Sequence, residues 1–244
     1  MKVLEYILST LKERKMHMTL IDPASQSEER AGRIAAIASR LGSDAFMVGG
    51  STGVTQENLE ATVKQIRKNA PGKPVIHFPT AAKVLSPSVD AIYFMSYLNS
   101  RNLRNVIGEQ VAGAPVIKKM GIEPIPMGYI VFEPGMKVGE VGEAMLIKRD
   151  DAKTAVAYAI AAEFLGMKLI YLEAGSGADE PVAPSTVAAV RNEISIPMIV
   201  GGGIRNGNRA KTLTDAGADI LVTGSVVEEA NFESRLKDIL SAIH

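Results

Sequence analysis

The chain of 244 residues contains no cysteine. It therefore cannot form a disulfide, bind zinc through thiolates or use a cysteine nucleophile. This composition agrees with a cytoplasmic protein, and we expect that location.

The chain also lacks an excess of charge of either sign, because 27 Lys and Arg residues balance 27 Asp and Glu residues. No overall positive field attracts nucleic acid, so we expect no nucleic-acid partner. An anionic substrate must instead be held locally, by a loop, a helix terminus or a metal ion.

Long uninterrupted hydrophobic runs are missing as well. Residues Met1–Met16 mix charged and apolar side chains as an amphipathic helix does, which is not the pattern of a signal peptide. The most apolar helical segment, Thr154–Met167, contains Glu163 and is too short to cross a bilayer.

What the sequence does contain is a regular alternation of short apolar runs and longer amphipathic segments, which predicts parallel strands joined by helices. Eight strands in about 240 residues favour a single closed (β/α)8 barrel, a TIM barrel, over residues 1–244. An open doubly wound sheet more often has fewer strands and a glycine fingerprint after the first. The expected strands are His17–Asp22, Ala45–Gly49, Pro74–Phe78, Ala91–Met95, Met127–Phe132, Leu169–Glu173, Met198–Gly201 and Ile220–Thr223. The clearest expected helices are Glu28–Leu41, Asp151–Leu165, Thr186–Ile194 and Arg205–Ala216.

One connection is too short for this pattern. Between the third and fourth strands only Pro79–Asp90 remains, with prolines at positions 79 and 87. So short a segment with two prolines cannot hold a full helix and two loops, and we predict that this helix is missing or vestigial. Apolar side chains would line part of the gap and form a groove for a long hydrocarbon chain: Ala81, Ala82, Val84 and Leu85.

Candidate functional residues stand at the carboxyl ends of the strands, where barrel enzymes place their active sites. The first strand ends in Asp22, and the second leads into Gly-Gly-Ser-Thr-Gly-Val at residues 49–54. Neighbouring strands would bring the Asp22 carboxylate close to a hydroxyl of Ser51 or Thr52. Oxygen ligands of this kind suit Mg²⁺, which also takes water and phosphate oxygens. The alternative is that Asp22 is only a helix cap or turn residue.

The sixth strand ends in a second group of candidates. Tyr171 and Glu173 point to the same side of the strand, and a buried carboxylate beside a phenol suits a general base for a hydroxyl. Alternatively, Glu173 is a structural carboxylate that caps the following loop. That loop offers backbone amides to a phosphate.

Glycine-rich turns follow the last two strands, at Gly201–Gly203 and Gly224-Ser225. In barrel enzymes this pair of turns is the recurring phosphate site, where amides and a helix dipole hold the charge without a basic residue. Arg205 either assists that site or is solvated at a helix start.

Other candidates are weaker. His77, at the end of the third strand, either contacts substrate or packs in the core. Aromatic side chains at Tyr93, Phe94 and Tyr129 either line an apolar cavity or fill the core. The segment Glu133–Asp150 is longer than a usual βα loop and is predicted to be a lid or a contact surface.

Five motifs taken together resemble those of one family. T-L-I-D-P at 19–23, G-G-S-T-G-V at 49–54, Y-L-E-A-G-S-G at 171–177, G-G-G-I-R at 201–205 and T-G-S at 223–225 are similar to geranylgeranylglyceryl phosphate synthase. That family has archaeal members and bacterial relatives such as heptaprenylglyceryl phosphate synthases. The resemblance runs from the first strand to the last helix. Its first three motifs are together specific, whereas the last two occur in many phosphate-binding barrels.

The resemblance implies an ether-forming prenyl transfer, the first ether bond of archaeal-type membrane lipids. The terminal hydroxyl of sn-glycerol 1-phosphate would attack geranylgeranyl diphosphate and release pyrophosphate. Asp22 and Ser51 would hold Mg²⁺ at the diphosphate, and Glu173, beside Tyr171, would stand near the attacking hydroxyl. Glycerol phosphate would be bound by Tyr171, Leu172, Glu173, Ala174, Gly175, Ser176, Gly177, Gly202, Gly203, Gly224 and Ser225.

The resemblance also implies a homo-oligomer, and a lipid donor implies peripheral contact with a membrane. The extended segment after the fifth strand is similar to the archaeal-type branch, whose usual donor is geranylgeranyl diphosphate. A longer prenyl diphosphate is the alternative donor, because one sequence does not define a chain-length ruler.

Two other functions compete with this one. A different phosphate-binding barrel enzyme would usually carry a paired acid and base on the first and fifth strands or a catalytic lysine on a strand, and Met127–Phe132 holds no acid. A non-catalytic barrel that only binds phosphometabolites has no need for Asp22, Ser51 and Glu173 together.

Overall fold

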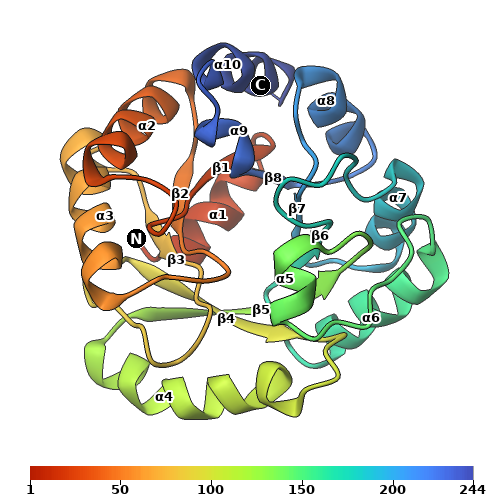
Figure 1. Cartoon of the computed structure of the whole chain (residues 1–244). Helices are drawn as coiled ribbons and strands as arrows, with labels where there is room; N and C mark the ends of the chain where they lie inside the picture. Colours follow the sequence, from red (N-terminus) through yellow and green to blue (C-terminus); the bar gives the residue numbers. More distant parts are fainter. Residues whose placement is uncertain (244) are drawn as a thin grey trace.

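A computed structural model of the chain describes residues 1–243. Within them, eight parallel strands close into one barrel in the order β1 to β8, and helices form an outer ring (Figure 1). The prediction of a (β/α)8 barrel is therefore confirmed. The strands are β1 (Met16–Ile21), β2 (Ala45–Val48), β3 (Val75–His77), β4 (Ala91–Tyr97), β5 (Glu123–Val131), β6 (Leu169–Glu173), β7 (Met198–Gly201) and β8 (Ile220–Thr223).

The expected helices are present with ends that shift by at most two residues. Within residues 1–243, none of the helices has both the length and the apolar character that a bilayer crossing requires. The helices are α1 (Val3–Leu11), α2 (Glu28–Leu41), α3 (Gln56–Asn69), α4 (Glu109–Met120) with the preceding π-helical turn η1 (Arg104–Gly108), α5 (Met136–Val141), α6 (Ala152–Phe164), α7 (Pro184–Glu193), α8 (Gly207–Asp215), α9 (Ser225–Glu228) and α10 (Phe232–Ile243).

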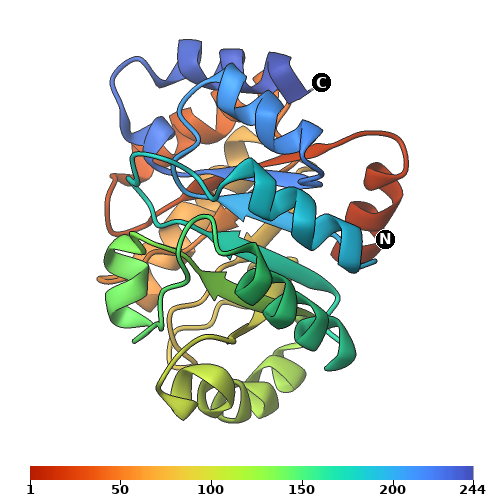
Figure 2. The ribbon, with the colours of Figure 1, turned by 90° about the vertical axis from the view of Figure 1, so that its right-hand side faces the viewer.

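Strand alternation divides the apolar core into an inner and an outer part. On β6, Leu169 and Tyr171 point into the barrel, whereas Ile170 and Leu172 pack against the helices. The amphipathic α1 closes the amino end of the barrel, because its Val3 and Ile7 are buried in the inner cluster. The helix α5 lies at the opposite end, beyond the carboxyl ends of the strands (Figure 2).

The strands β4 and β5 are longer than the sequence suggested. The fifth strand begins at Glu123 rather than at the predicted Met127, and Pro124 and Pro126 both pair with β4 in regular register. The Pro126 carbonyl accepts a hydrogen bond from Lys168 N, so the ring nitrogens of both prolines face the β6 side. Because β6 begins opposite Met127, the missing N–H groups remove no ladder hydrogen bond.

The helix between β3 and β4 is absent, as predicted from its short connection. Residues 78–90, all of which are described, contain no helix. The segment instead lies against α4 and forms an apolar cleft with it, lined by Ala81, Ala82 and Leu85 and by Gly113 and Ile117 of α4. Val84, which we also expected in the lining, packs against the core instead.

Aspartates fasten the amino ends of the strands in a repeated arrangement. Asp44, Asp90 and Asp219 each precede a strand and accept the backbone N–H of a residue in the neighbouring strand. The three donors are His17, Val75 and Met198, at 2.8 to 3.0 Å. Each carboxylate also binds one guanidinium, from Arg14, Arg67 or Arg191. Lateral pairing of these strands is therefore secured at the end of the barrel away from the mouth.

We predict that alanine in place of Asp44, Asp90 or Asp219 lowers the free energy of unfolding by about 1–3 kcal/mol, because a backbone N–H and an arginine lose a charged acceptor. Urea unfolding measures this loss. The control is Asp215→Ala, which removes only an exposed pair with Lys211 on α8 and should cost about 0.5 kcal/mol or less. Equal small losses in all four variants would contradict the fastening role.

Candidate active site

Two adjoining clefts open at the carboxyl ends of the strands, and Glu173 and Ser176 line both of them. The first, which we call the β1–β2 cleft, is lined by Asp22, Ser51, Phe78, Tyr97, Tyr129 and Glu228. The second, the β7–β8 cleft, is lined by Tyr171, Gly202, Gly203, Ile204, Gly224 and Ser225. A larger hollow of about 1360 Å³ lies at the amino end of the barrel, beside α1 and α4, and contains none of the predicted site residues.

In the β1–β2 cleft the structure brings Asp22 and Ser51 together, as the sequence predicted. The half-buried Asp22 carboxylate lies directly against Gly50, where a Cβ would collide with it. Oδ1 accepts the N–H of Ala24 at 2.8 Å, and partial burial raises the pKa of the carboxyl. Thr52, the alternative hydroxyl, is exposed and lies outside the cleft. Among residues 1–243 no three His, Asp or Glu side chains cluster as a metal site.

Sequence reasoning missed Glu228, a second acid at the rim of this cleft. It belongs to the short helix α9, after the Gly224-Ser225 turn. Burial and the nearby charge of Asp22 both raise the pKa of Glu228. The T-G-S motif signals the turn but not the direction of the helix after it, so no sequence pattern pointed to this residue.

Glu173 is 6% exposed and stands between the clefts. Its Oε1 accepts the N–H of Gly175 at 2.6 Å, and the hydroxyls of Tyr171 and Tyr129 donate to its carboxylate. Burial raises the pKa of Glu173, and these hydrogen bonds oppose the rise. Tyr129 is therefore a partner of the carboxylate as well as part of the barrel core, with its ring 5.0 Å from that of Tyr171.

Backbone groups of the glycine-rich turns line much of the β7–β8 cleft. Gly202 and Gly203 have φ of +81° and +71°, and a Cβ on Gly202 would lie 2.6 Å from Glu173 Oε1. Within residues 1–243, the N–H groups of Gly203, Ile204, Gly224 and Ser225 donate no hydrogen bond to another residue. Unpaired amides that line a concave surface suit an anion such as phosphate.

Several predicted residues reach the site only through their backbone or not at all. The side chains of Leu172 and Ala174 face the helices, so only their peptide groups are near the clefts. His77 is 1% exposed and lines neither cleft, and burial lowers its pKa to about 4, which keeps it neutral. Arg205 binds the carbonyls of Gly177 and Ala178, so it is not a freely solvated side chain.

The segment Glu133–Asp150 reaches over the mouth. Val138 and Val141, three residues apart on α5, line the β1–β2 cleft. Gly135 N donates to the carbonyl of Ala174 at 3.1 Å, which joins the segment to the loop after β6. This position is that of a cover over the clefts, and both predicted roles of the segment, lid and contact surface, stay predictions.

Comparison with known proteins decides the family. The model of the PcrB family matches residues 9–243. The chain belongs to the PcrB family. Among curated PcrB-family relatives, a geranylgeranylglyceryl phosphate synthase from Picrophilus torridus is 50% identical over 244 residues, which is all of both chains. One from Pyrococcus horikoshii is 50% identical over 242 residues, 99% of this chain and 95% of the relative. The family predicted from the motifs is thus confirmed.

Solved structures of PcrB-family proteins share the whole fold. The (S)-3-O-geranylgeranylglyceryl phosphate synthase from Thermoplasma acidophilum, solved with its substrate sn-glycerol-1-phosphate, has a TM-score of 0.97 and 46% identity over 100% of this chain and 98% of its own. The Thermoplasma volcanium protein has a TM-score of 0.95 and 45% identity over the same shares. A tryptophan synthase alpha chain from Legionella pneumophila, 14% identical over 100% of this chain and 97% of its own, has a TM-score of 0.62 and shows a similar fold alone.

We predict that Glu173→Gln in this PcrB-family protein lowers turnover by about 10²–10⁴-fold, because the amide cannot accept a proton. The affinity for glycerol phosphate should change little, since the shape and most hydrogen bonds of the side chain persist. Steady-state kinetics and calorimetric titration separate the two effects. In the wild type, turnover should fall as the pH drops through the raised pKa of Glu173.

The matched control is Glu163→Gln, the same change on α6 at a carboxylate that binds Ser195 N. A wild-type rate in Glu173→Gln, or an equal loss in both variants, would remove Glu173 from the chemistry.

Proposed function

We propose that this protein transfers a geranylgeranyl group from its diphosphate to the terminal hydroxyl of sn-glycerol 1-phosphate. The oxygen–carbon ether bond forms at the first carbon of the prenyl chain, and the bond from that carbon to the diphosphate breaks. The observation that carries this proposal is the placement of Glu173, buried between a cleft whose carboxylate and hydroxyl suit a divalent cation and a cleft whose unpaired amides suit an anion. Two curated relatives named geranylgeranylglyceryl phosphate synthase, matched over 100% and 95% of their length, support it.

The β7–β8 cleft holds the acceptor in this proposal. The N–H groups of Gly203, Ile204, Gly224 and Ser225 donate to the phosphate, which leaves the glycerol part directed toward Glu173. The carboxylate takes the proton of the attacking hydroxyl, while Gly175 N–H and two tyrosine hydroxyls hold its orientation. Burial favours proton uptake, because a neutral carboxyl is less costly in an apolar barrel than a charged one.

The β1–β2 cleft holds the diphosphate of the donor, with Mg²⁺. The donor set fits this ion: Asp22 supplies a carboxylate, Ser51 supplies a hydroxyl, and the remaining positions are left to water and phosphate oxygens. When bound, Mg²⁺ offsets the negative charge that develops on the leaving diphosphate. Gly50 has no side chain, and this leaves the space beside the loop that the Asp22 carboxylate occupies at the cleft.

The prenyl tail extends into the apolar cleft between residues 79–85 and α4. This cleft shares Pro79, Thr80, Met95 and Tyr97 with the β1–β2 cleft, so the two clefts adjoin. Its open space is about 50 Å³, less than a twenty-carbon chain occupies, so its walls must separate when the tail enters. Geranylgeranyl is the proposed donor, and a longer prenyl group remains the alternative.

Assembly and location remain predictions. The exposed apolar side chains of η1 and α4, Ile107, Val111 and Met120, suit either a second copy of the chain or the surface of a membrane. We propose a cytoplasmic homo-oligomer that contacts membranes peripherally.

The deciding experiment incubates the purified protein with labelled sn-glycerol 1-phosphate and Mg²⁺. Farnesyl, geranylgeranyl and heptaprenyl diphosphates are supplied in separate reactions. We expect an ether-linked product and pyrophosphate, with the highest kcat/KM for geranylgeranyl diphosphate. Absence of ether product with every donor, at any Mg²⁺ concentration, would overturn the proposed function.

We predict that Asp22→Asn reduces Mg²⁺-dependent binding of inorganic pyrophosphate by about tenfold or more, because the amide removes the anionic ligand. Binding of glycerol 1-phosphate in the other cleft should persist. Calorimetric titration with and without Mg²⁺ measures both, and Asp215→Asn on α8 is the control. Pyrophosphate binding that survives in Asp22→Asn with its Mg²⁺ dependence intact would show that the ion is held elsewhere.

A further inference from the structure

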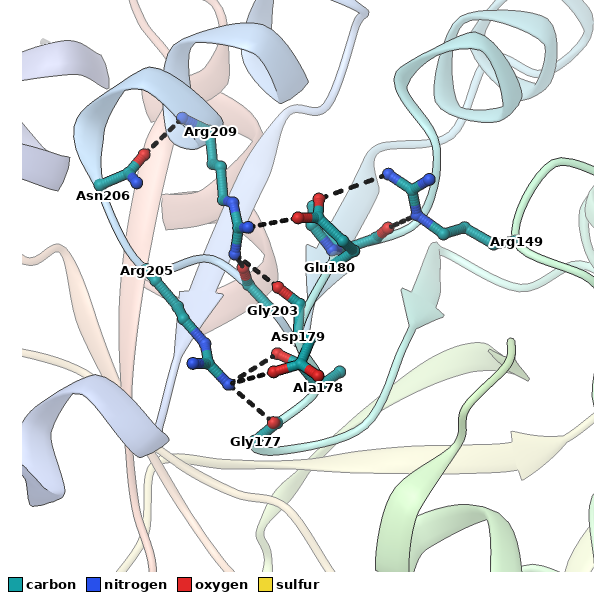
Figure 3. A network of polar contacts seen from close by, with 10 residues as sticks. Arg149, Gly177, Ala178, Asp179, Glu180, Gly203, Arg205, Asn206 and Arg209 are labelled. Atoms are coloured by element: carbon teal, nitrogen blue, oxygen red, sulfur yellow. Dashed lines mark hydrogen bonds and ion pairs between the residues drawn. The ribbon is translucent and has the colours of Figure 1, made fainter.

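The loop after β6, residues 174–183, is bound by arginines that belong to other segments (Figure 3). Arg149 precedes α6, Arg205 follows β7 and Arg209 lies in α8. Their guanidinium groups donate to backbone carbonyls at 2.6 to 3.2 Å, those of Gly177, Ala178, Asp179 and Pro181. The conformation of this loop therefore depends on charges outside it.

Arg209 is the arginine that connects both loops of the β7–β8 cleft. Its Nη1 donates to the carbonyl of Asp179 at 2.6 Å and to that of Gly203 at 2.9 Å. Its Nη2 binds the Glu180 carboxylate, which also lies 3.6 Å from Arg149 Nη2. The loops touch at this point, because a Cβ on Gly203 would lie 2.5 Å from the backbone nitrogen of Pro181.

The position of Arg209 is electrostatically unfavourable for the helix that carries it. Asn206 caps α8 by accepting the N–H of Arg209 at 2.9 Å, so the arginine lies in the first turn. A positive charge is disfavoured at a helix amino end, and this turn contains no acidic residue to offset it. The helix itself gives no reason for an arginine at this place.

The contact with Gly203 supplies a reason. The carbonyl of Gly203 and the N–H of Ile204 belong to one planar trans peptide and point in opposite directions. Because Arg209 binds the carbonyl, the N–H of Ile204 is turned away from α8. Gly202, Gly203 and Ile204 all line the β7–β8 cleft, and this N–H has no partner within residues 1–243.

We propose that Arg209 is a positioning residue for the phosphate of the acceptor. It fixes the Gly203–Ile204 peptide with its N–H toward the phosphate and locks this turn to the loop after β6. The inference rests on the proposed function, because the phosphate is that of the acceptor. Arg209 acts through the backbone and does not touch the substrate.

Arg209→Lys tests this role, because it keeps the positive charge but not the planar fork that reaches three acceptors at once. We expect the Kd for glycerol 1-phosphate and the KM for it to rise about tenfold. The value of kcat at saturating acceptor and the Kd for pyrophosphate with Mg²⁺ should stay within about twofold. Glu180→Gln removes the carboxylate that binds the Arg209 guanidinium, and it should also raise the Kd for glycerol 1-phosphate. Because Glu180 lies on the exposed loop, this variant leaves the core unchanged.

Arg40→Lys is the matched control, because within residues 1–243 Arg40 pairs with Glu233 alone, on the surface. Wild-type affinity for glycerol 1-phosphate in both Arg209→Lys and Glu180→Gln would overturn the positioning role and leave the proposed function intact. An equal loss of acceptor and pyrophosphate binding would also overturn it, since that indicates general damage to the barrel. If the wild type binds neither glycerol 1-phosphate nor inorganic phosphate, the proposed function itself fails.

Discussion

The site depends on the absence of side chains where β7 ends. Gly201 lies opposite Glu173 in the ladder, and a Cβ there would collide with the hydroxyl of Tyr171. A Cβ on the next residue, Gly202, would meet the Glu173 carboxylate itself. The glycines therefore do two things. They create the space in which a carboxylate and a phenol can be buried beside each other, and they expose the amides that face an anion.

This arrangement explains how a chain without net charge can bind the two anionic substrates that we propose. Each half of the mouth uses a different means: a carboxylate and a hydroxyl that suit a divalent cation on the β1–β2 side, and unpaired amides on the β7–β8 side. On the β7–β8 side, Arg205 and Arg209 bind backbone carbonyl groups, and Arg209 also binds Glu180. Their charge therefore organises the protein backbone, which is a role that net composition does not reveal.

Periodicity and spacing were enough to predict the barrel, the missing helix and the grouping of Asp22, Ser51 and Glu173. These features depend on the local pattern and on one rule, that strand ends of a barrel meet at its mouth. The same reasoning failed where contacts join distant segments. The predicted fifth strand begins at Met127 rather than Glu123, and the two prolines in the missed part, Pro124 and Pro126, fit a strand only on a side without a hydrogen-bonding partner. Three other features cannot be predicted without knowing how segments far apart in the sequence are placed in space. They are the position of Glu228 at the cleft, the hydrogen bond of the Tyr129 hydroxyl to Glu173 and the contact of Arg209 with Gly203.

The aspartates at the amino ends of β2, β4 and β8 stabilise one end of the barrel, and the clefts lie at the other end. Hydrogen bonds of Asp44, Asp90 and Asp219 hold neighbouring strands together at the end farthest from the clefts. Loops at the mouth and α5 can therefore rearrange around a lipid without parting the strands beneath them. Opening at the mouth then leaves the strand pairing at the amino ends in place, so the proposed long-tailed donor can enter while that end of the barrel stays closed.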